Sequence, residues 1–209
     1  MPTSRKRNSK RRLTKVERAD LAVARLLALD PDRLPGKLVS RFAEIGDQPP
    51  LATISVATAV VGALRRDERL FRTGLRMLTA LSLSTMAKTI GKGTIDRTRP
   101  AEVLENGRYK LQEGDSKDAD LRSMPSGHSA GVTAVMLAAT YDYPKQVLPA
   151  AAVAGAVMGA QLPSRNHFLS DIAAGAALGL LTGVLSRMLV PRRAELKREE
   201  LRESGAAGA

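Results

Sequence analysis

Hydrophobic residues gather in long stretches between Leu51 and Val190, and short polar or proline-containing stretches separate them. Apolar runs of this length without a breaker predict helices. The predicted apolar helices span Leu51–Leu64, Phe71–Ile90, Ser129–Tyr143, Gln146–Leu162 and Ile172–Val190. We therefore expect an all-α protein, a helical bundle with several helices embedded in a membrane.

Two amphipathic segments precede this apolar region. Val16–Leu29 alternates apolar and charged residues at helical spacing and ends at Asp30-Pro31-Asp32. A second short helix is predicted over Leu34–Ile45. Neither is apolar enough to cross a bilayer, so we expect both to lie on the membrane surface or to pack on the bundle.

Only the last apolar segment approaches the length of a membrane span. Ile172–Val190 is nearly long enough, whereas Leu51–Leu64 is short for a span of about 20 residues. Glycines four apart recur in the last two helices, and such spacing lets helices approach closely in lipid. These are Gly155 and Gly159, then Gly175, Gly179 and Gly183. Arg72 and Arg76 near one end of Phe71–Ile90 are expected to snorkel to the interface.

The charged residues are concentrated outside the apolar region and at its ends. They divide the chain into a basic, disordered tail over residues 1–14, a helical domain over 15–190 and a charged tail over 191–209. The net charge of +12 attracts anionic lipid and nucleic acid alike. No base-reading motif is present and aromatics make up only 3%, so the membrane is the expected partner and nucleic acid is not.

The basic segments also predict an orientation. By the positive-inside rule, both tails and the Arg65–Arg69 turn should be cytoplasmic, which places the motifs described below on the periplasmic or extracellular face. This arrangement leaves the start of Leu51–Leu64 on the outer face without a clear preceding span. Either Asp20–Ile45 crosses the membrane imperfectly, or the first apolar segment is re-entrant.

Pro125-Ser126-Gly127-His128 directly precedes a breaker-free apolar segment. It therefore sits at a predicted helix N-terminus, where free backbone N–H groups and the helix dipole favour a phosphate-like anion. His128 adds a group that can transfer a proton near neutral pH. A Ser/Gly helix cap with an incidental histidine is the structural alternative.

The only other histidine is His167, with Asp171 four residues later. A carboxylate there can fix the tautomer of the ring and stabilise the imidazolium. Two apolar segments joined by Tyr143-Pro144-Lys145 separate the histidines, and each would run about 25 Å as a helix. An antiparallel hairpin of this kind returns His167 to the end of the molecule that holds His128. Two histidines at one gap suit a nucleophile and a general acid.

A third segment, Lys92 to Arg99-Pro100, follows another apolar helix and ends at a helix-breaking proline. Lysine and arginine neutralise phosphate, and arginine can do so with two hydrogen bonds. A basic interfacial loop is the alternative for this segment alone.

Together, the three segments resemble the signature of the type 2 phosphatidic acid phosphatase (PAP2) superfamily, which also contains vanadium haloperoxidases. The resemblance covers roughly Leu51 to Val190 and implies a helical bundle that hydrolyses phosphate esters without a metal or other cofactor. It also implies that His167 is the nucleophile, that Asp171 orients it and that His128 protonates the leaving oxygen. The residues that would hold the phosphoryl oxygens are Lys92, Arg99, Ser126 and Gly127.

The chain departs from the family pattern at Gln161, where the family motif that contains the nucleophilic histidine has an arginine. Arg165, two residues before His167, is the only nearby arginine. We expect Arg165 to reach the phosphate from the loop; the alternative is a surface residue that leaves the site one cation short.

Ala101–Ser123 lacks periodicity and is predicted to be a polar loop, either a lid over the phosphate pocket or a disordered connector. No cysteine and only two histidines are present, so a zinc site is not expected.

These features favour a membrane-associated phosphatase that hydrolyses a lipid phosphate or pyrophosphate through a phosphohistidine. A vanadate-dependent haloperoxidase of the same fold is one alternative. A non-enzymatic basic protein that binds membrane or nucleic acid is another. The oligomeric state stays open.

Overall fold

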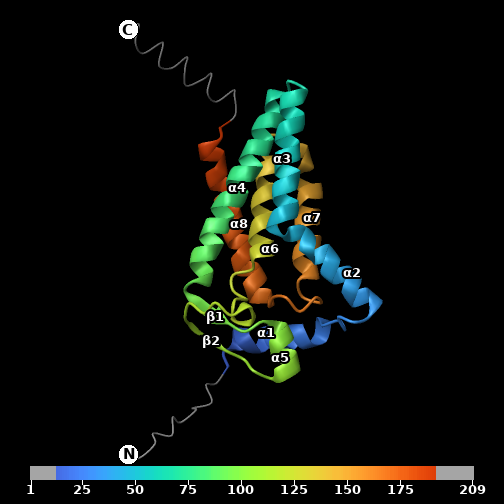
Figure 1. Ribbon diagram of the computed structural model, residues 1–209, viewed down its shortest axis with the longest axis vertical. Coiled ribbons are helices and arrows are strands. Elements are labelled where there is room, and N and C mark those ends of the chain that lie inside the picture. The colour runs from blue at the N-terminus through green and yellow to red at the C-terminus, as the bar shows by residue number, and fades with distance from the viewer. Residues whose placement is uncertain (1–12, 192–209) are drawn as a thin grey trace, which may run out of the picture.

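The computed structural model describes residues 13–191, and these form a helical bundle with one small sheet (Figure 1). The all-α prediction is confirmed. The α-helices are α1 Lys15–Leu27, α2 Leu34–Ala43, α3 Gln48–Leu64, α4 Glu68–Lys92, α5 Pro100–Asn106, α6 Gly127–Thr140, α7 Val147–Ala160 and α8 Leu169–Leu189. Short 3-10 turns occupy Glu44–Gly46, Ala119–Leu121 and Pro144–Gln146. Strands β1 Ile95–Arg97 and β2 Leu111–Glu113 pair antiparallel.

Helices α3, α4, α6, α7 and α8 run side by side along the long axis of the molecule (Figure 1). The core lies among α3, α4, α6 and α7, where Leu51, Met77, Val135 and Val157 pack together. The 3-10 turn at Pro144 reverses the chain, so α6 and α7 form the predicted antiparallel hairpin. The motif segments at the ends of α4, α6 and α7 consequently share one end of the bundle.

Glycines in α8 allow it to approach α6 closely. A Cβ atom at Gly175 would lie 2.3 Å from the Ser126 carbonyl oxygen, and one at Gly179 would lie 2.5 Å from that of Ala130. The predicted small-residue spacing in α8 is therefore a packing device within the chain. At Gly155 and Gly159 of α7 an added Cβ would meet no described atom of another element within 4 Å.

Helices α1 and α2 remain at the end of the bundle that holds the motifs, and α1 lies beneath it (Figure 1). Glu17 and Asp20 of α1 are almost fully buried there. The Asp20–Ile45 region therefore does not cross beside the bundle. The first apolar segment, α3, is one continuous helix that runs to the far end of the bundle and joins α4 there (Figure 1).

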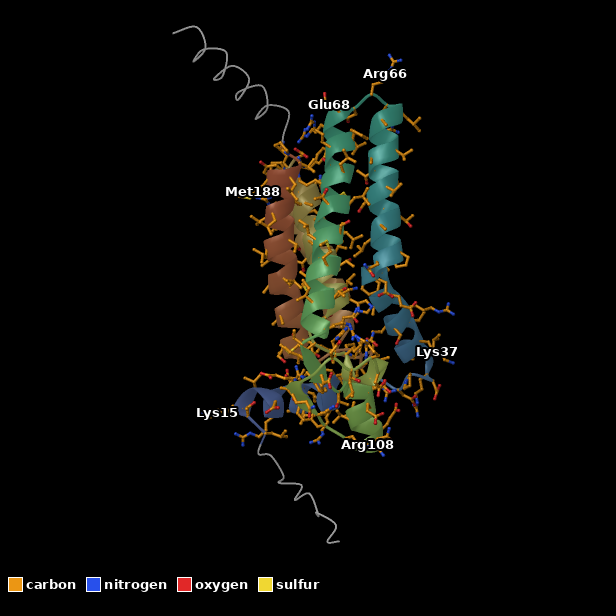
Figure 2. The ribbon with its side chains drawn as sticks, turned by 60° about the vertical axis from the view of Figure 1, so that its left-hand side comes forward. Lys15, Lys37, Arg66, Glu68, Arg108 and Met188 are labelled. Atoms are coloured by element: carbon orange, nitrogen blue, oxygen red, sulfur yellow. The ribbon has the colours of Figure 1, made fainter. Side chains whose placement is uncertain are left out.

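The predicted placement of the start of the chain requires a correction. Lys15 lies at the opposite end of the molecule from Arg66 and Met188 (Figure 2). The described start of the chain and the Arg65–Arg69 turn therefore cannot share one side of a membrane that the bundle crosses. The charge pattern misled because it gave no sign that α1 is anchored by buried carboxylates. The tails, residues 1–12 and 192–209, lie outside the described residues.

Arg76 does not snorkel. Its side chain is fully buried, pairs with Asp142 and donates to the Val190 carbonyl oxygen at 2.9 Å. Asp142 follows α6, so a carboxylate from a distant segment neutralises the arginine, which the pattern of α4 alone could not indicate. Arg72 instead forms an ion pair with Glu68 at 3.2 Å.

Ala101–Ser123 is folded and contains α5, β2 and the 3-10 turn Ala119–Leu121. The prediction of an irregular loop was therefore wrong. Two backbone hydrogen bonds tie the end of this segment to the Lys92–Pro100 segment. The N–H of Arg99 donates to the Asp120 carbonyl at 2.8 Å, and the N–H of Ser123 donates to the Arg97 carbonyl at 3.1 Å. These hydrogen bonds hold the backbone around Arg97 and Arg99 in place.

Within residues 13–191, α8 is the one helix long and apolar enough to cross a membrane, and α3 is a shorter apolar helix. Large hydrophobic side chains nevertheless point outward from several bundle helices. On α3 and α8 they include Ile54, Val56, Val60, Leu180, Leu181, Val184 and Met188.

Candidate active site

The three motif segments meet at one polar cavity of about 310 Å³. Lys92 lies at the end of α4, and Arg99 directly precedes α5. His128 lies in the first turn of α6, and His167 lies in the loop before α8. The remaining lining residues are Gly46, Asp47, Gln48, Pro49, Lys88 and Gly127. The predicted convergence of residues distant in sequence is therefore present.

The two histidine rings lie edge to face, with centroids 5.6 Å apart and an interplanar angle of 65°. The local fold that presents His128 is the predicted one: Ser126 is the N-cap of α6, and its Oγ accepts a hydrogen bond from the backbone N–H of Ser129 at 3.3 Å. Gly127 lines the cavity, whereas Ser126 is fully buried behind it. A direct contact between Ser126 and phosphate stays a prediction.

His167 is 1% exposed, and its Nδ1 lies 3.9 Å from Oδ2 of Asp171. This separation exceeds a hydrogen bond, and Nδ1 has no hydrogen-bond partner within the described part of the chain. Asp171 Oδ2 instead accepts from the Ser123 hydroxyl at 2.6 Å and the Phe168 N–H at 2.9 Å. Asp171 thus lies beside the imidazole without a hydrogen bond to it, and its role in orienting the ring stays a prediction.

Burial is the main cause of a strong downward shift in the pKa of His167, well below 6.5. The nearby positive charges of Arg99 and Lys92 lower the pKa further. The imidazole is consequently neutral at pH 7. A neutral ring keeps a lone pair on nitrogen, which a nucleophile requires.

Arg97 is a residue that the sequence analysis missed. Its side chain is buried, and Nη1 donates to Asp171 Oδ1 while Nη2 donates to Asp20 Oδ2, both at 2.6 Å. The guanidinium carbon lies 4.5 Å from the Phe168 ring centroid. Arg97 therefore locks the start of α8 onto α1. In the sequence it looked like one more cation in a basic loop, because nothing marked Asp20 as its partner.

Asp47 is the second missed residue. It is the N-cap of α3, and its Oδ1 lies 2.8 Å from Nε2 of His128. Burial lowers the pKa of His128 below its usual value, and the carboxylate of Asp47 only partly offsets this shift. The sequence offered only the turn signal Gly46-Asp47 before Gln48-Pro49-Pro50, which marks a helix boundary and not a partner for a residue in α6.

Arg165 does not line the cavity; its Nη1 lies 3.2 Å from Oε1 of Glu105 in α5. Gln161 is fully buried and is used for structure: its Nε2 donates to the Ala43 carbonyl at 3.0 Å, and its Oε1 accepts from Asn166 at 3.1 Å. The geometry gives no support to the expectation that Arg165 reaches the phosphate.

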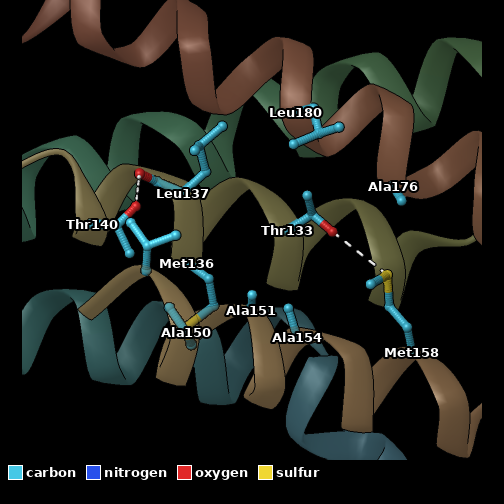
Figure 3. A pocket seen from close by; sticks show the side chains of 11 residues that line it. Thr133, Met136, Leu137, Thr140, Ala150, Ala151, Ala154, Met158, Ala176 and Leu180 are labelled. Carbon is cyan, nitrogen blue, oxygen red and sulfur yellow. Dashed lines mark hydrogen bonds between the residues drawn. The ribbon is translucent and has the colours of Figure 1, made fainter. Parts of the chain in front are cut away.

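A second hollow of about 270 Å³ lies between α6, α7 and α8 (Figure 3). Its lining is almost entirely apolar; the Thr133 hydroxyl contacts the Met158 sulfur at 3.6 Å across it. No residue of the three motifs borders it, so it is separate from the polar cavity. In residues 13–191 there is no group of three or more His, Cys, Asp or Glu side chains that could hold a metal ion.

A family model described as the PAP2 superfamily matches residues 73–195. The match covers more than half of the chain, so the protein belongs to the PAP2 superfamily. The resemblance drawn from the three sequence segments is confirmed. A search of curated proteins gave no match.

Two solved structures share the fold. The first transmembrane PAP2 type phosphatidylglycerolphosphate phosphatase from Bacillus subtilis has a TM-score of 0.60 and 18% identity, covering 87% of this chain and 90% of that one. Aquifex aeolicus LpxE has a TM-score of 0.60 and 20% identity, covering 79% of this chain and 93% of that one. At these identities the similarity establishes the helical fold.

Proposed function

We propose that the protein is a membrane phosphatase that hydrolyses a lipid phosphate or pyrophosphate through a phosphohistidine on His167, without a metal ion. The proposal rests on the convergence of His128 and His167 at one cavity that Lys92 and Arg99 also line. This arrangement supplies a nucleophile, a proton donor and positive charge around one tetrahedral phosphorus.

In the first step, a ring nitrogen of neutral His167 attacks phosphorus. The bond from phosphorus to the leaving alcohol or phosphate oxygen breaks, and His128 donates its proton to that oxygen. The dephosphorylated lipid departs and a phosphorylated His167 remains. Asp47, 2.8 Å from His128, partly offsets the lowering of the His128 pKa by burial, and so favours the proton that this histidine must donate.

In the second step, water attacks the phosphohistidine. The neutral His128 left by the first step accepts a proton from this water, the phosphorus–nitrogen bond breaks, and inorganic phosphate leaves. Both histidines return to their starting protonation states. Asp171 stabilises the positive charge that develops on the His167 ring in each step.

The cations do not exchange protons in this scheme. Lys92 and Arg99 bind the non-bridging oxygens, where negative charge is concentrated in the transition state. The backbone N–H of Gly127 at the start of α6 adds a donor in the same cavity. Arg97 contributes indirectly by holding Asp171 in place.

The apolar outer faces of the bundle helices favour a lipid substrate. Helix α2 and the turn after it expose large apolar side chains: Leu34, Leu38, Phe42 and Ile45. The chain leads directly from Ile45 into Gly46 and Asp47, which line the cavity. Such exposed side chains fit the membrane interface and would place the cavity at headgroup depth. The Bacillus subtilis structure of the same fold is a phosphatidylglycerolphosphate phosphatase.

A multi-pass location in the cell's inner membrane belongs to the same proposal. The turn between α3 and α4, with Arg65 and Arg66, lies at the end away from the cavity (Figure 2), and Arg69 follows at the start of α4. The positive-inside rule then places that end in the cytoplasm and the active site on the periplasmic or extracellular side.

Phosphate release by purified protein in detergent, from a panel of lipid phosphates with EDTA present, tests this function. We expect turnover by the wild type and none by His167→Asn. Loss of wild-type activity on chelation would contradict the metal-free reaction. Halide oxidation with vanadate and peroxide, without phosphate release, would favour the haloperoxidase alternative.

A further inference from the structure

A cation outside the three motif segments also lines the catalytic cavity. Lys88 lies one helical turn before Lys92 on α4, so both side chains project from the same face of the helix. The sequence analysis gave Lys88 no role, because it falls inside an apolar helix ahead of the recognised motif.

Lys88 lies directly against the start of α6. A Cβ atom on Gly127 would lie 2.8 Å from Cδ of Lys88 and 3.3 Å from its Nζ. The missing side chain of Gly127 therefore provides the space that the lysine occupies. The ammonium group sits beside the first turn of α6, where the unpaired N–H groups and the helix dipole already favour an anion.

Within residues 13–191, the ammonium of Lys88 forms no ion pair. Asp47 is the neighbouring carboxylate, and it is engaged with His128 at 2.8 Å. Lys88 is half-buried in a wall that also carries Lys92 and Arg99. Three positive groups gathered around one cavity repel one another unless an anion binds between them.

Two other candidates for the anion site, Gln161 and Arg165, are already bound elsewhere. Gln161 is fully buried in hydrogen bonds to Ala43 and Asn166, and Arg165 pairs with Glu105. Neither supplies a group to the cavity. Lys88 is thus the one further lining cation in the described part of the chain.

We propose that Lys88 is a substrate-binding residue: its ammonium hydrogen-bonds a non-bridging oxygen of the phosphoryl group, alongside Lys92 and Arg99. This inference rests on the proposed function and identifies the group that completes the anion site. Because the phosphoryl oxygens are charged in the bound state and in the transition state, Lys88 lowers KM and raises kcat/KM.

Binding of inorganic phosphate to purified protein, measured by titration calorimetry, tests the role of Lys88 without any turnover. Lys88→Met keeps the stem that packs on Gly127 and removes the charge, and Lys88→Arg restores it. We expect phosphate to bind about tenfold more weakly to Lys88→Met and near the wild-type affinity to Lys88→Arg. Lys117→Met, at an exposed lysine on the same end of the molecule, is the matched control and should not change the affinity.

Equal phosphate affinity in wild type and Lys88→Met would overturn the inference, as would a wild type that does not bind phosphate. A matched loss in Lys88→Met and Lys88→Arg would do the same, because it would show a packing role. Lys88-dependent phosphate binding without lipid phosphate turnover would refute the proposed function and leave the anion site standing. Turnover with Lys88→Met at wild-type kcat/KM would refute only the role of Lys88.

Discussion

The carboxylate of Asp47 lies 2.8 Å from Nε2 of His128, although 81 positions separate them in the chain. Asp47 is the N-cap residue of α3 and His128 lies in the first turn of α6, so the pair exists only because both helices begin at the same end of the bundle. Each histidine of the site therefore has its own aspartate, Asp47 for His128 and Asp171 for His167.

Asp47→Asn should slow reactions that need a protonated leaving group. Since general acid catalysis is typically worth about 10²–10⁴ in rate, and Asp47 acts through His128, we expect kcat on a lipid phosphate to fall about tenfold. Release of 4-nitrophenolate needs no proton, so 4-nitrophenyl phosphate should be hydrolysed at close to the wild-type rate. Equal losses on both substrates, measured by steady-state kinetics, would exclude this role.

Arg97→Met should destabilise the fold. The substitution leaves Asp20 and Asp171 buried without their shared cation, and breaking a buried ion pair costs about 3–5 kcal/mol. Thermal unfolding in detergent should show a large drop in Tm, whereas Arg108→Met, at an exposed position of the same end, should leave Tm unchanged. An unaltered Tm in Arg97→Met would show that the network does not stabilise the start of α8.

Stability should fall in acid because the pKa of His167 is held well below 6.5 in the folded protein. Below pH 6.5 the unfolded chain binds a proton that the folded chain does not. One such group removes about 1.4 kcal/mol per pH unit until the folded pKa is reached. Tm measured from pH 7.5 down to 5 should therefore drop less steeply in His167→Gln than in the wild type. Parallel curves of Tm against pH for the two proteins would contradict a lowered pKa of His167.

Gly179→Ala should disrupt the packing of α8 on α6. The new methyl group would meet the Ala130 carbonyl oxygen at 2.5 Å, and such overpacking against backbone costs about 3 kcal/mol. Gly155→Ala is the matched control, because its added methyl would meet no described atom of another element within 4 Å, and alanine favours helix by up to about 1 kcal/mol. Chemical denaturation should show a lower free energy of unfolding for Gly179→Ala and a higher one for Gly155→Ala. Similar losses in both variants would be inconsistent with this packing.

The sequence predicted the bundle helices well, because their periodicity and breakers are local signals. These signals predicted the α6–α7 hairpin and the helix start at Ser126. Both features together predicted that His128 and His167 converge. The hairpin length fixed that result, since two helices of equal length must return the chain to its starting end.

Long-range partners could not be predicted. Asp47, Asp20 and Asp142 each bind a residue from a distant element, and each looked like an ordinary charge at a helix boundary or on a helix face. The pairing of Arg165 with Glu105 was missed for the same reason, because Glu105 lies in a segment that looked irregular. The orientation of the chain's start was misjudged because charge counts do not distinguish buried carboxylates from solvated ones.

Trapping the covalent intermediate tests the central claim most directly. Purified protein mixed with lipid phosphate, quenched in alkali to preserve phosphohistidine and digested for mass spectrometry, should carry one phosphoryl group on His167. The group should accumulate in His128→Ala incubated with an activated aryl phosphate, because hydrolysis of the intermediate then lacks its base. Phosphate release by an enzyme that never carries the label on His167, or turnover by His167→Asn, would contradict the account.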